Sequence, residues 1–175
     1  MVSSYYIPMP LKGLQSYEFF RHIEMSKEIE RKFLVVNQSY KSMATSCDHI
    51  VQGYLSRNVD ATVRVRLRND KSFLTVKGRN HGIERDEWEY AIPLDDARCM
   101  LQRLVDGPVI DKQRYIVPYS GKVWEVDEFS SPDAGLVVAE VELTSVDEEF
   151  DIPPFIGEEV TGDPRYYNSM LGIKK

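Results

Sequence analysis

The sequence predicts a mainly β protein whose core is an antiparallel barrel or a strongly curved sheet. Eight stretches alternate apolar and polar side chains, as strands with two different faces do. Only one stretch, from Ala97 to Leu104, repeats apolar residues convincingly at helical spacing. Turn residues such as Asn69-Asp70 and Gly107-Pro108 separate these stretches. Together these features favour a sheet with few helices over an α/β fold.

Composition limits the function classes that need to be considered. The chain has 175 residues, 42% hydrophobic and 29% charged, which suits one folded domain with a possible appendage. A net charge of -6 argues against a general binder of nucleic acid or of anionic membranes, although a local basic pocket remains compatible with it. We therefore expect no specific nucleic-acid partner.

Cysteine and histidine are too sparse for common metal or disulfide frameworks. Cys47 and Cys99 show no paired spacing, and His22, His49 and His81 are scattered, so neither a disulfide framework nor a zinc site is expected. No apolar run is long enough to span a bilayer, and no stretch reads as a signal peptide. The expectation is a cytoplasmic protein without a membrane partner.

The first residues differ from the rest of the chain. Residues 1–24 contain the extended, proline-broken run Tyr5–Pro10 and a weak helical pattern from Gln15 to Glu24. We treat 1–24 as an N-terminal extension and 25–175 as the domain. Two hypotheses remain: the native protein starts at Met25, or the extension is an arm that packs on the domain. The intact mass of the native protein distinguishes them.

The first predicted strand runs from Glu28 through Val36. In a strand, alternate side chains share a face, so Glu28, Glu30 and Lys32 point the same way. Such a face needs water, a metal, a ligand or opposite charges. A solvated edge strand would also account for this stretch taken alone.

The next predicted strands also gather polar or charged side chains on one face. His49–Leu55 places Gln52 and Tyr54 on one face, and Ala61–Arg68 alternates arginines with aliphatic residues. A turn at 69–71 leads into a strand from Ser72 to Val76 that ends at Lys77-Gly78, and Gly82 breaks the chain. Arg85–Ile92 then sets its charges, Arg85, Glu87 and Glu89, opposite Trp88 and Tyr90.

The second half begins with the helix. Asp95 and Asp96 are suited to start it, and Gly107-Pro108 is expected to stop it. Strands follow at Val109–Val117, Lys122–Phe129 and Leu136–Leu143. Asp163-Pro164 is a typical helix start, so Arg165–Leu171 is expected to form a closing helix.

The charged faces carry two complementary groups. The acidic group comprises Glu28, Glu30, Glu87, Glu89, Glu125, Asp127, Glu140 and Glu142, and the basic group Lys32, Arg64, Arg66, Lys77, Arg85, Lys112 and Arg114. Hard divalent cations prefer carboxylate oxygens, whereas phosphates prefer Arg and Lys. A metal-bridged oligophosphate in a wet tunnel would use both groups, and the alternative is an array of salt bridges on a solvated sheet face.

Several motifs resemble those of one known family. Glu28-Ile29-Glu30-Arg31-Lys32 resembles the ExExK signature of the CYTH domain, or triphosphate tunnel metalloenzyme, superfamily. The likeness continues along the remaining domain through Gln52-Gly53-Tyr54-Leu55, Val63–Arg66, Leu74–Gly78, Glu87–Tyr90, Asp111–Tyr115, Trp124–Asp127, Ala139–Leu143, Gly157–Thr161 and Arg165-Tyr166. The short bacterial, inorganic triphosphatase-like branch is the most similar.

The resemblance implies a closed eight-stranded antiparallel tunnel with a few flanking helices. It implies a metal-dependent triphosphatase that acts on tripolyphosphate or another triphosphate-bearing small molecule, including nucleoside triphosphates, with Mg²⁺ or Mn²⁺ as cofactor. A homodimer is left open. Class IV-type adenylate cyclase, thiamine triphosphatase and a non-catalytic polyphosphate- or nucleotide-binding module are the alternatives, and a cyclase could use Tyr5, Tyr6 or Tyr166 near the nucleoside.

The resemblance also implies residue roles. Phosphate ligands would be Lys32, Arg64, Arg66, Lys77, Lys112, Arg114 and Arg165, with Arg165 capping the phosphate end from the closing helix. Metal ligands, direct or through water, would be Glu28, Glu30, Glu87, Glu89, Asp127, Glu140 and Glu142. Lys32 and Tyr54 would form a catalytic dyad, although Tyr54 could equally be a wall residue. Glu125 has no assigned role, and Arg68 and Arg85 are interpreted first as solvated charges.

Overall fold

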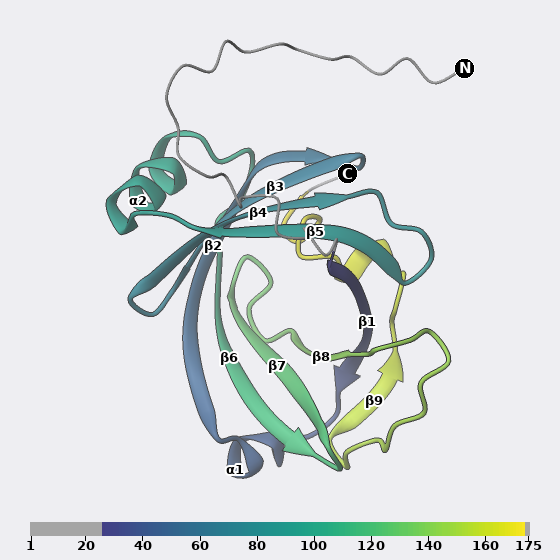
Figure 1. The fold of residues 1–175 in the computed structure, drawn as a ribbon. Coiled ribbons are helices and arrows are strands. Elements are labelled where there is room, and N and C mark those ends of the chain that lie inside the picture. Colours follow the sequence, from purple (N-terminus) through teal and green to yellow (C-terminus); the bar gives the residue numbers. More distant parts are fainter. Residues whose placement is uncertain (1–25, 174–175) are drawn as a thin grey trace, which may run out of the picture.

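A computed structural model describes residues 26–173, and their strands close into a barrel (Figure 1). The N-terminal extension predicted at 1–24 lies outside the described residues. The strands, in chain order, are β1 Ser26–Val35, β2 Ser46–Asn58, β3 Ala61–Arg68, β4 Lys71–Gly78, β5 Glu84–Ala91, β6 Ile110–Tyr119, β7 Lys122–Ser131, β8 Val137–Glu142 and β9 Ile156–Glu159. The helices are α1 Tyr40–Met43, α2 Leu94–Arg103 and a 3₁₀ helix, Pro164–Tyr166.

Closure depends on β1, which completes the ring. The sheet order is β5-β4-β3-β2-β6-β7-β8-β1-β9, and an additional pairing joins β5 to β1. The first half of β1 pairs with β5, where Glu28 lies opposite Arg85, and its second half pairs with β8, where Lys32 lies opposite Glu140. All these pairings are antiparallel, which confirms the predicted closed eight-stranded barrel.

Strand β9 is a further strand that the sequence pattern does not predict. Phe33 of β1 pairs with Ala139 of β8 on one edge and with Glu159 of β9 on the other. Gly157 allows this close approach, because a Cβ there would lie 2.4 Å from a methyl carbon of Val36. Four residues are too few for an alternation pattern to reveal the strand from sequence.

Hairpin turns set the register of the strands. Asn69, between β3 and β4, has a φ of +53°, and the turn between β6 and β7 has two left-handed residues, Ser120 and Gly121, with φ of +47° and +81°. Two-residue turns of this kind match the right-handed twist of paired strands. Because register decides which side chains face inward, these turns help to place the charged rows in the interior.

The outward-facing residues form an apolar core on the outside of the barrel. Phe33, Trp124, Val126 and Val141 are nearly inaccessible, and loop residue Phe155 covers them together with Tyr40 of α1. The rings of Phe33 and Trp124 lie 5.5 Å apart, which is a tilted aromatic contact. The predicted division, with apolar residues outside and charges inside, is confirmed over this part of the barrel.

Helix α2 packs on the outside of β2, β3 and β4. It begins at Leu94 and ends at Arg103, earlier than the predicted stop at Gly107-Pro108. Gly53 of β2 faces it, and a Cβ there would lie 2.5 Å from Val105, just beyond the helix. Neither this helix nor any other in the described residues is long and apolar enough to cross a membrane.

The predicted closing helix at 165–171 is wrong in extent. Asp163 does cap Arg165 with its side chain, and Pro164 occupies the first turn, but only a three-residue 3₁₀ helix forms. Two carbonyls of the expected helix accept hydrogen bonds from elsewhere: that of Tyr166 from Lys32 and that of Ser169 from Arg57. These tertiary contacts hold the segment against the barrel.

Candidate functional site

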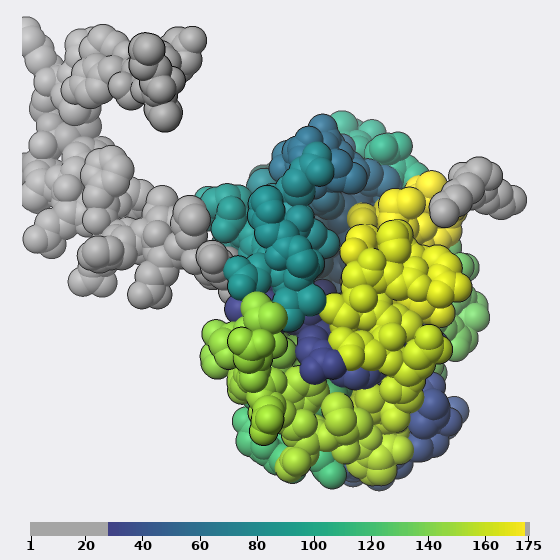
Figure 2. Space-filling model, turned by 90° about the vertical axis from the view of Figure 1, so that its right-hand side faces the viewer, coloured from purple at the N-terminus to yellow at the C-terminus, as the bar shows by residue number. Residues whose placement is uncertain are grey.

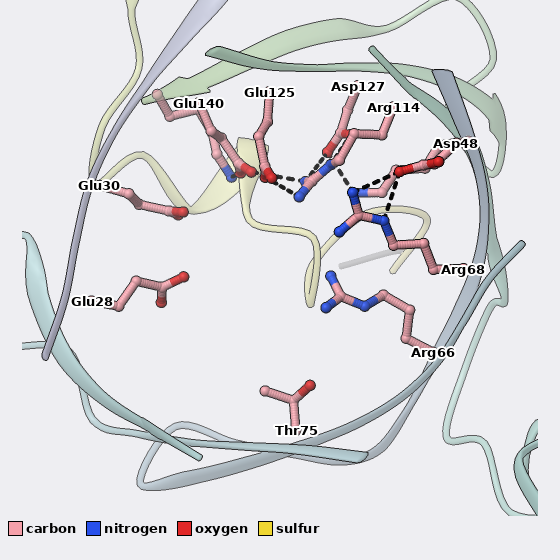
Figure 3. A network of polar contacts seen from close by, with 12 residues as sticks. Glu28, Glu30, Asp48, Arg66, Arg68, Thr75, Arg114, Glu125, Asp127 and Glu140 are labelled. Atoms are coloured by element: carbon pink, nitrogen blue, oxygen red, sulfur yellow. Dashed lines mark hydrogen bonds and ion pairs between the residues drawn. The ribbon is translucent and has the colours of Figure 1, made fainter. Parts of the chain in front are cut away.

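The barrel encloses a cavity of about 400 Å³ whose wall is mostly charged. Figure 3 shows the labelled side chains pointing into the ring of strands. Most of the predicted site residues line it: Glu28, Glu30, Lys32, Tyr54, Arg64, Arg66, Lys77, Glu87, Glu89, Arg114, Glu140 and Glu142. The strand alternation thus brings together side chains from distant parts of the sequence.

One end of the interior is apolar rather than charged. Along the inward faces, the charged residues of β6, β7 and β8 give way to Ile110, Phe129 and Val138, which pack with Tyr54 and Leu171. Leu171, in the C-terminal segment, therefore helps to close that end. In Figure 2 the yellow C-terminal segment faces the teal residues across a narrow hollow, beside the purple surface of β1. The interior of the barrel thus combines a charged cavity with an apolar cluster at one end.

Arginines of β3 form a cationic wall. Arg66 donates to Glu89 (Nη2–Oε2 2.7 Å), and Arg64 donates to Thr75 (Nη2–Oγ1 3.1 Å), which in turn donates to Glu89. The Nε atoms of Arg64 and Arg66 are buried and have no hydrogen-bond partner within the described part of the chain. Burial, with Arg64 and Arg114 nearby, lowers the pKa of Arg66 to about 10. The wall therefore carries excess positive charge and suits an anion.

Lysines extend this wall on two sides. Lys77 Nζ lies 2.7 Å from Glu87 Oε2 and 2.9 Å from Glu28 Oε2, and Lys32 Nζ lies 2.7 Å from Glu140 Oε1. Burial alone would lower the pKa of Lys32, but Glu140 and Glu30 outweigh it and raise that pKa above its usual value. Lys32 is thus a permanent cation in the cavity.

A fully buried ion cluster supports the wall from behind. Asp127 is inaccessible, and its carboxylate accepts from Lys112 (2.5 Å) and twice from Arg114 (both 2.6 Å). Arg114 also donates to Glu140 at 3.0 Å and to Glu125. Lys112 and Asp127 do not line the cavity, so a direct contact with phosphate or metal would require this cluster to open.

The opposite wall is acidic. Glu28, Glu30, Glu125, Glu140 and Glu142 line a second hollow of about 380 Å³. Glu30 lies 3.7 Å from a guanidinium nitrogen of Arg85, a long ion pair. Burial, with Glu140 and Glu28 nearby, raises the pKa of Glu30 to about 7. In contrast, Lys77 and Arg85 overcome the effect of burial and lower the pKa of Glu28 to about 2. Negative charge is therefore in excess around Glu30, which suits a cation.

These carboxylates face cations in this structure. Among residues 26–173, no group of three or more His, Cys, Asp or Glu side chains converges closely enough to hold a metal ion. Part of the salt-bridge alternative is thus correct, since most of the charges are paired. Ion pairing among these described residues is incomplete, however, at the Nε atoms of Arg64 and Arg66 and at the carboxylate of Glu30. The arginines suit an anionic ligand, and the glutamate suits a cation.

Three arginines lie in places that the sequence analysis does not anticipate. Arg165 is 73% exposed in its side chain, pairs with Asp163 and does not line the cavity. Arg68 and Arg85, interpreted as solvated charges, both line the cavity. Arg85 pairs with Glu28 at 2.6 Å, and Arg68 with Asp48 at 2.6 Å. A phosphate role for Arg165 stays a prediction.

Tyr54 is a wall residue whose surroundings restrain it. It is 5% exposed, lines the cavity, and lies under the guanidinium of Arg57, 4.7 Å from the ring centroid. Burial raises the pKa of its hydroxyl, so Tyr54 keeps its proton at neutral pH. Its predicted part in a dyad with Lys32 stays a prediction.

Some polar residues in or next to the cavity escape the sequence analysis. Thr75, between the side chains of Arg64 and Glu89, shares the inward face with Lys77, so alternation could have revealed it. Asp48 shares a face with Gln52, but the predicted strand begins one residue after it. Residues 167–169 come from the irregular C-terminal segment, which carries no periodic signal.

Comparisons with known proteins all identify relatives from one family. A family model described as the CYTH domain matches residues 26–167. An inorganic triphosphatase of Acetivibrio thermocellus is 50% identical over 147 residues, which cover 84% of this chain and 94% of that protein. An inorganic triphosphatase of Nitrosomonas europaea is 35% identical over 151 residues, which cover 83% of this chain and 97% of that protein.

Solved structures agree with this relationship. One structure of an inorganic triphosphatase aligns with a TM-score of 0.61 and 30% identity, covering 85% of this chain and 95% of its own. A protein from Pyrococcus horikoshii aligns with a TM-score of 0.54 at 21% identity, covering 69% of this chain and 80% of its own, and shows the shared fold alone.

Proposed function

Because this chain belongs to the CYTH domain family, we propose that it hydrolyses inorganic triphosphate in the barrel cavity. One observation carries the proposal: a cationic wall with unpartnered arginine nitrogens, among the residues that the structure describes, faces an acidic wall with excess negative charge across a single cavity. An oligophosphate with a divalent cation satisfies both walls at once. The 50% identical relative is an inorganic triphosphatase, in agreement with this reading.

Substrate binding would exchange one set of ion pairs for another. Phosphate oxygens would take the place of Glu89 and Glu87 as acceptors for Arg66 and Lys77, and would also reach the buried Nε–H of Arg64. Arginine offers paired N–H donors that fit phosphate geometry, and lysine adds a point charge. The released carboxylates would then be available to a cation.

The residues that would hold Mg²⁺ or Mn²⁺ are the carboxylates of the acidic wall. Glu28, Glu30, Glu140 and Glu142 line the same hollow, and oxygen donors are those both ions prefer. When bound, such an ion would neutralise phosphate oxygens and lower the pKa of the attacking water. The raised pKa of Glu30, caused first by burial and then by nearby Glu140, supports the proposal of a cation at this wall.

The reaction requires no covalent intermediate with the protein, because water is the nucleophile. The oxygen of water bonds to the terminal phosphorus, the bridging P–O bond breaks, and orthophosphate and diphosphate leave, with the protons of water passing to the products and solvent. Lys32 stays protonated and supplies positive charge to the oxygens that become more negative. Tyr54, which keeps its proton, can donate a hydrogen bond from the cavity wall.

A substrate panel tests the proposal. Tripolyphosphate, ATP and thiamine triphosphate are each supplied with Mg²⁺ and with Mn²⁺, and phosphate release is measured alongside cyclic AMP formation. We expect metal-dependent release from tripolyphosphate, the largest of the three rates. Cyclic AMP as the main product from ATP would indicate a cyclase instead. Tight tripolyphosphate binding without turnover with either ion would indicate a binding module.

Two further expectations remain predictions. The reaction is expected to take place in the cytoplasm, and a homodimer is left open. Fractionation of the native host and the mass of the protein in solution test them.

A further inference from the structure

Arg57 lies near the end of β2 and donates hydrogen bonds to two other segments of the chain, the turn at 106–108 and the C-terminal segment. Its Nε donates to the carbonyl of Asp106 (2.6 Å), its Nη2 to that of Pro108 (3.5 Å) and its Nη1 to that of Ser169. The guanidinium also covers the ring of Tyr54, 4.7 Å from the centroid. All three hydrogen-bond acceptors are backbone carbonyls. Arg57 therefore holds the backbone of these segments in place and does not pair with a carboxylate through these bonds.

The turn at 106–108 is shaped to receive this guanidinium. Gly107 has a φ of +88°, and a Cβ there would lie 3.2 Å from Nη2 of Arg57. The backbone N–H of Asp106 also donates to the carbonyl of Tyr54 at 2.8 Å. The turn therefore holds Tyr54 twice, directly through its backbone and indirectly through Arg57 stacked on its ring.

The third contact reaches the active-site wall. Tyr167, Asn168 and Ser169 line the cavity, on a segment with no regular helix beyond Tyr166. Two cations hold this segment by its carbonyls: Lys32 from inside the cavity, at 3.2 Å from the oxygen of Tyr166, and Arg57 at Ser169. Arg57 thus connects the candidate catalytic Tyr54 to the segment that lies over it.

We propose that Arg57 is a positioning residue of this active site, which holds the Tyr54 ring and the wall segment 167–169 in place for triphosphate hydrolysis. The inference rests on the proposed function for its catalytic consequence. Its structural part is independent of that function. Lysine cannot replace Arg57, because a single ammonium cannot reach three carbonyls and also lie flat on the ring.

Kinetics of Arg57→Ala and Arg57→Lys test the catalytic part. We expect kcat for tripolyphosphate to fall about 10-fold or more in both, because displacement of active-site groups by about 1 Å already has large effects on rate. Added guanidinium ion should restore part of the activity of Arg57→Ala. The matched control is Arg98→Ala on the surface of α2, whose partner is Asp95, and it should keep the wild-type rate.

A double-mutant cycle with Tyr54→Phe identifies the route. If Arg57 acts through Tyr54, replacing Arg57 should lower kcat by a smaller factor in the Tyr54→Phe variant than in the wild type. Full additivity, or an unchanged kcat in Arg57→Ala, would overturn the proposal.

Hydrogen exchange separates failure of this inference from failure of the proposed function. The amides of Tyr167, Met170 and Leu171 are hydrogen-bonded within the segment, so they should exchange faster in Arg57→Ala while α2 keeps its protection. Unchanged exchange there would contradict the inference, even if the rate falls. If the wild type does not hydrolyse tripolyphosphate, the proposed function fails, whereas the exchange result still tests what Arg57 holds.

Discussion

At the scale of single residues, Asp127 is a buried charge that accepts hydrogen bonds from two cations, Lys112 and Arg114. Burial would raise its pKa, but Arg114 and Lys112 outweigh that effect and lower it below the ordinary value of 3.8. Burial, with Arg114 nearby, lowers the pKa of Lys112 to about 8 although Asp127 opposes this. Each of these charges depends on the others, because none reaches solvent to any useful extent.

Asp127→Asn should therefore destabilise the fold strongly. Removing one partner of a buried ion pair costs about 3–5 kcal/mol, measured here as the free energy of urea unfolding at pH 7. Since the folded pKa is below the unfolded one, the stabilisation exists above about pH 4 and declines as the pH falls further. Asp111→Asn, at a half-exposed partner of His49, is the control and should change little. A loss under about 1 kcal/mol would contradict this account.

Glu30 shows the opposite behaviour. Its pKa of about 7 means that the folded state resists ionisation, so wild-type stability should fall as the pH rises from about 4.5 to 7. In chelator at about pH 8, Glu30→Gln should be more stable than the wild type by on the order of 1 kcal/mol. Thermal unfolding with chelator and with Mn²⁺ measures this, and the advantage should shrink or reverse with the ion. A less stable variant in chelator would show that Glu30 is adequately neutralised by Arg85.

At the scale of elements, strand alternation is the feature that sequence reports best. Arg64 and Arg66 alternate with Val63, Val65 and Leu67, and this pattern alone predicts which side chains face the interior. The closed barrel is implied by the family resemblance and not by the pattern, because alternation does not say which strands meet. Residues 165–171 show the limit: the helix start is present, but only a three-residue 3₁₀ helix forms, and two carbonyls of the segment accept hydrogen bonds from Lys32 and Arg57. Such contacts depend on long-range packing and leave no local signal.

Gly53 tests how closely α2 must approach the barrel. A Cβ at this position would lie 2.5 Å and 2.9 Å from the two methyl carbons of Val105, so Gly53→Ala must push the segment after α2 away from β2. We expect a loss of about 1–3 kcal/mol in unfolding free energy. Gly78→Ala is the matched control, since its Cβ would meet Asp86 at an ordinary 3.7 Å. Equal stabilities of the two variants would mean that the segment can move aside freely.

At the scale of the whole molecule, the barrel brings acidic and basic side chains close together, but their pairing into ion pairs is incomplete. Basic residues on β3, β4 and β6 and acidic residues on β1, β5, β7 and β8 meet around one cavity, with the apolar core on the outside. The apolar cluster around Tyr54 and Leu171 closes one end, and the C-terminal segment lies over it. An oligophosphate with a divalent cation carries both charge signs. It can pair with the arginines and the glutamate that lack full partners in the described part of the chain, Arg64, Arg66 and Glu30.

The most direct measurement is phosphate release from tripolyphosphate by Arg66→Ala and Glu140→Gln, one variant for each wall of the cavity. We expect each to lose about 100-fold or more in kcat/KM with Mg²⁺ or Mn²⁺ present. Arg66→Ala removes positive charge from the site where negative charge develops, and Glu140→Gln removes one of the carboxylates proposed to hold the metal ion. Arg98→Ala and Asp95→Asn, an exposed ion pair on α2, should keep the wild-type rate. Wild-type rates in both cavity variants, with the fold intact, would contradict the claim that the reaction takes place between these two walls.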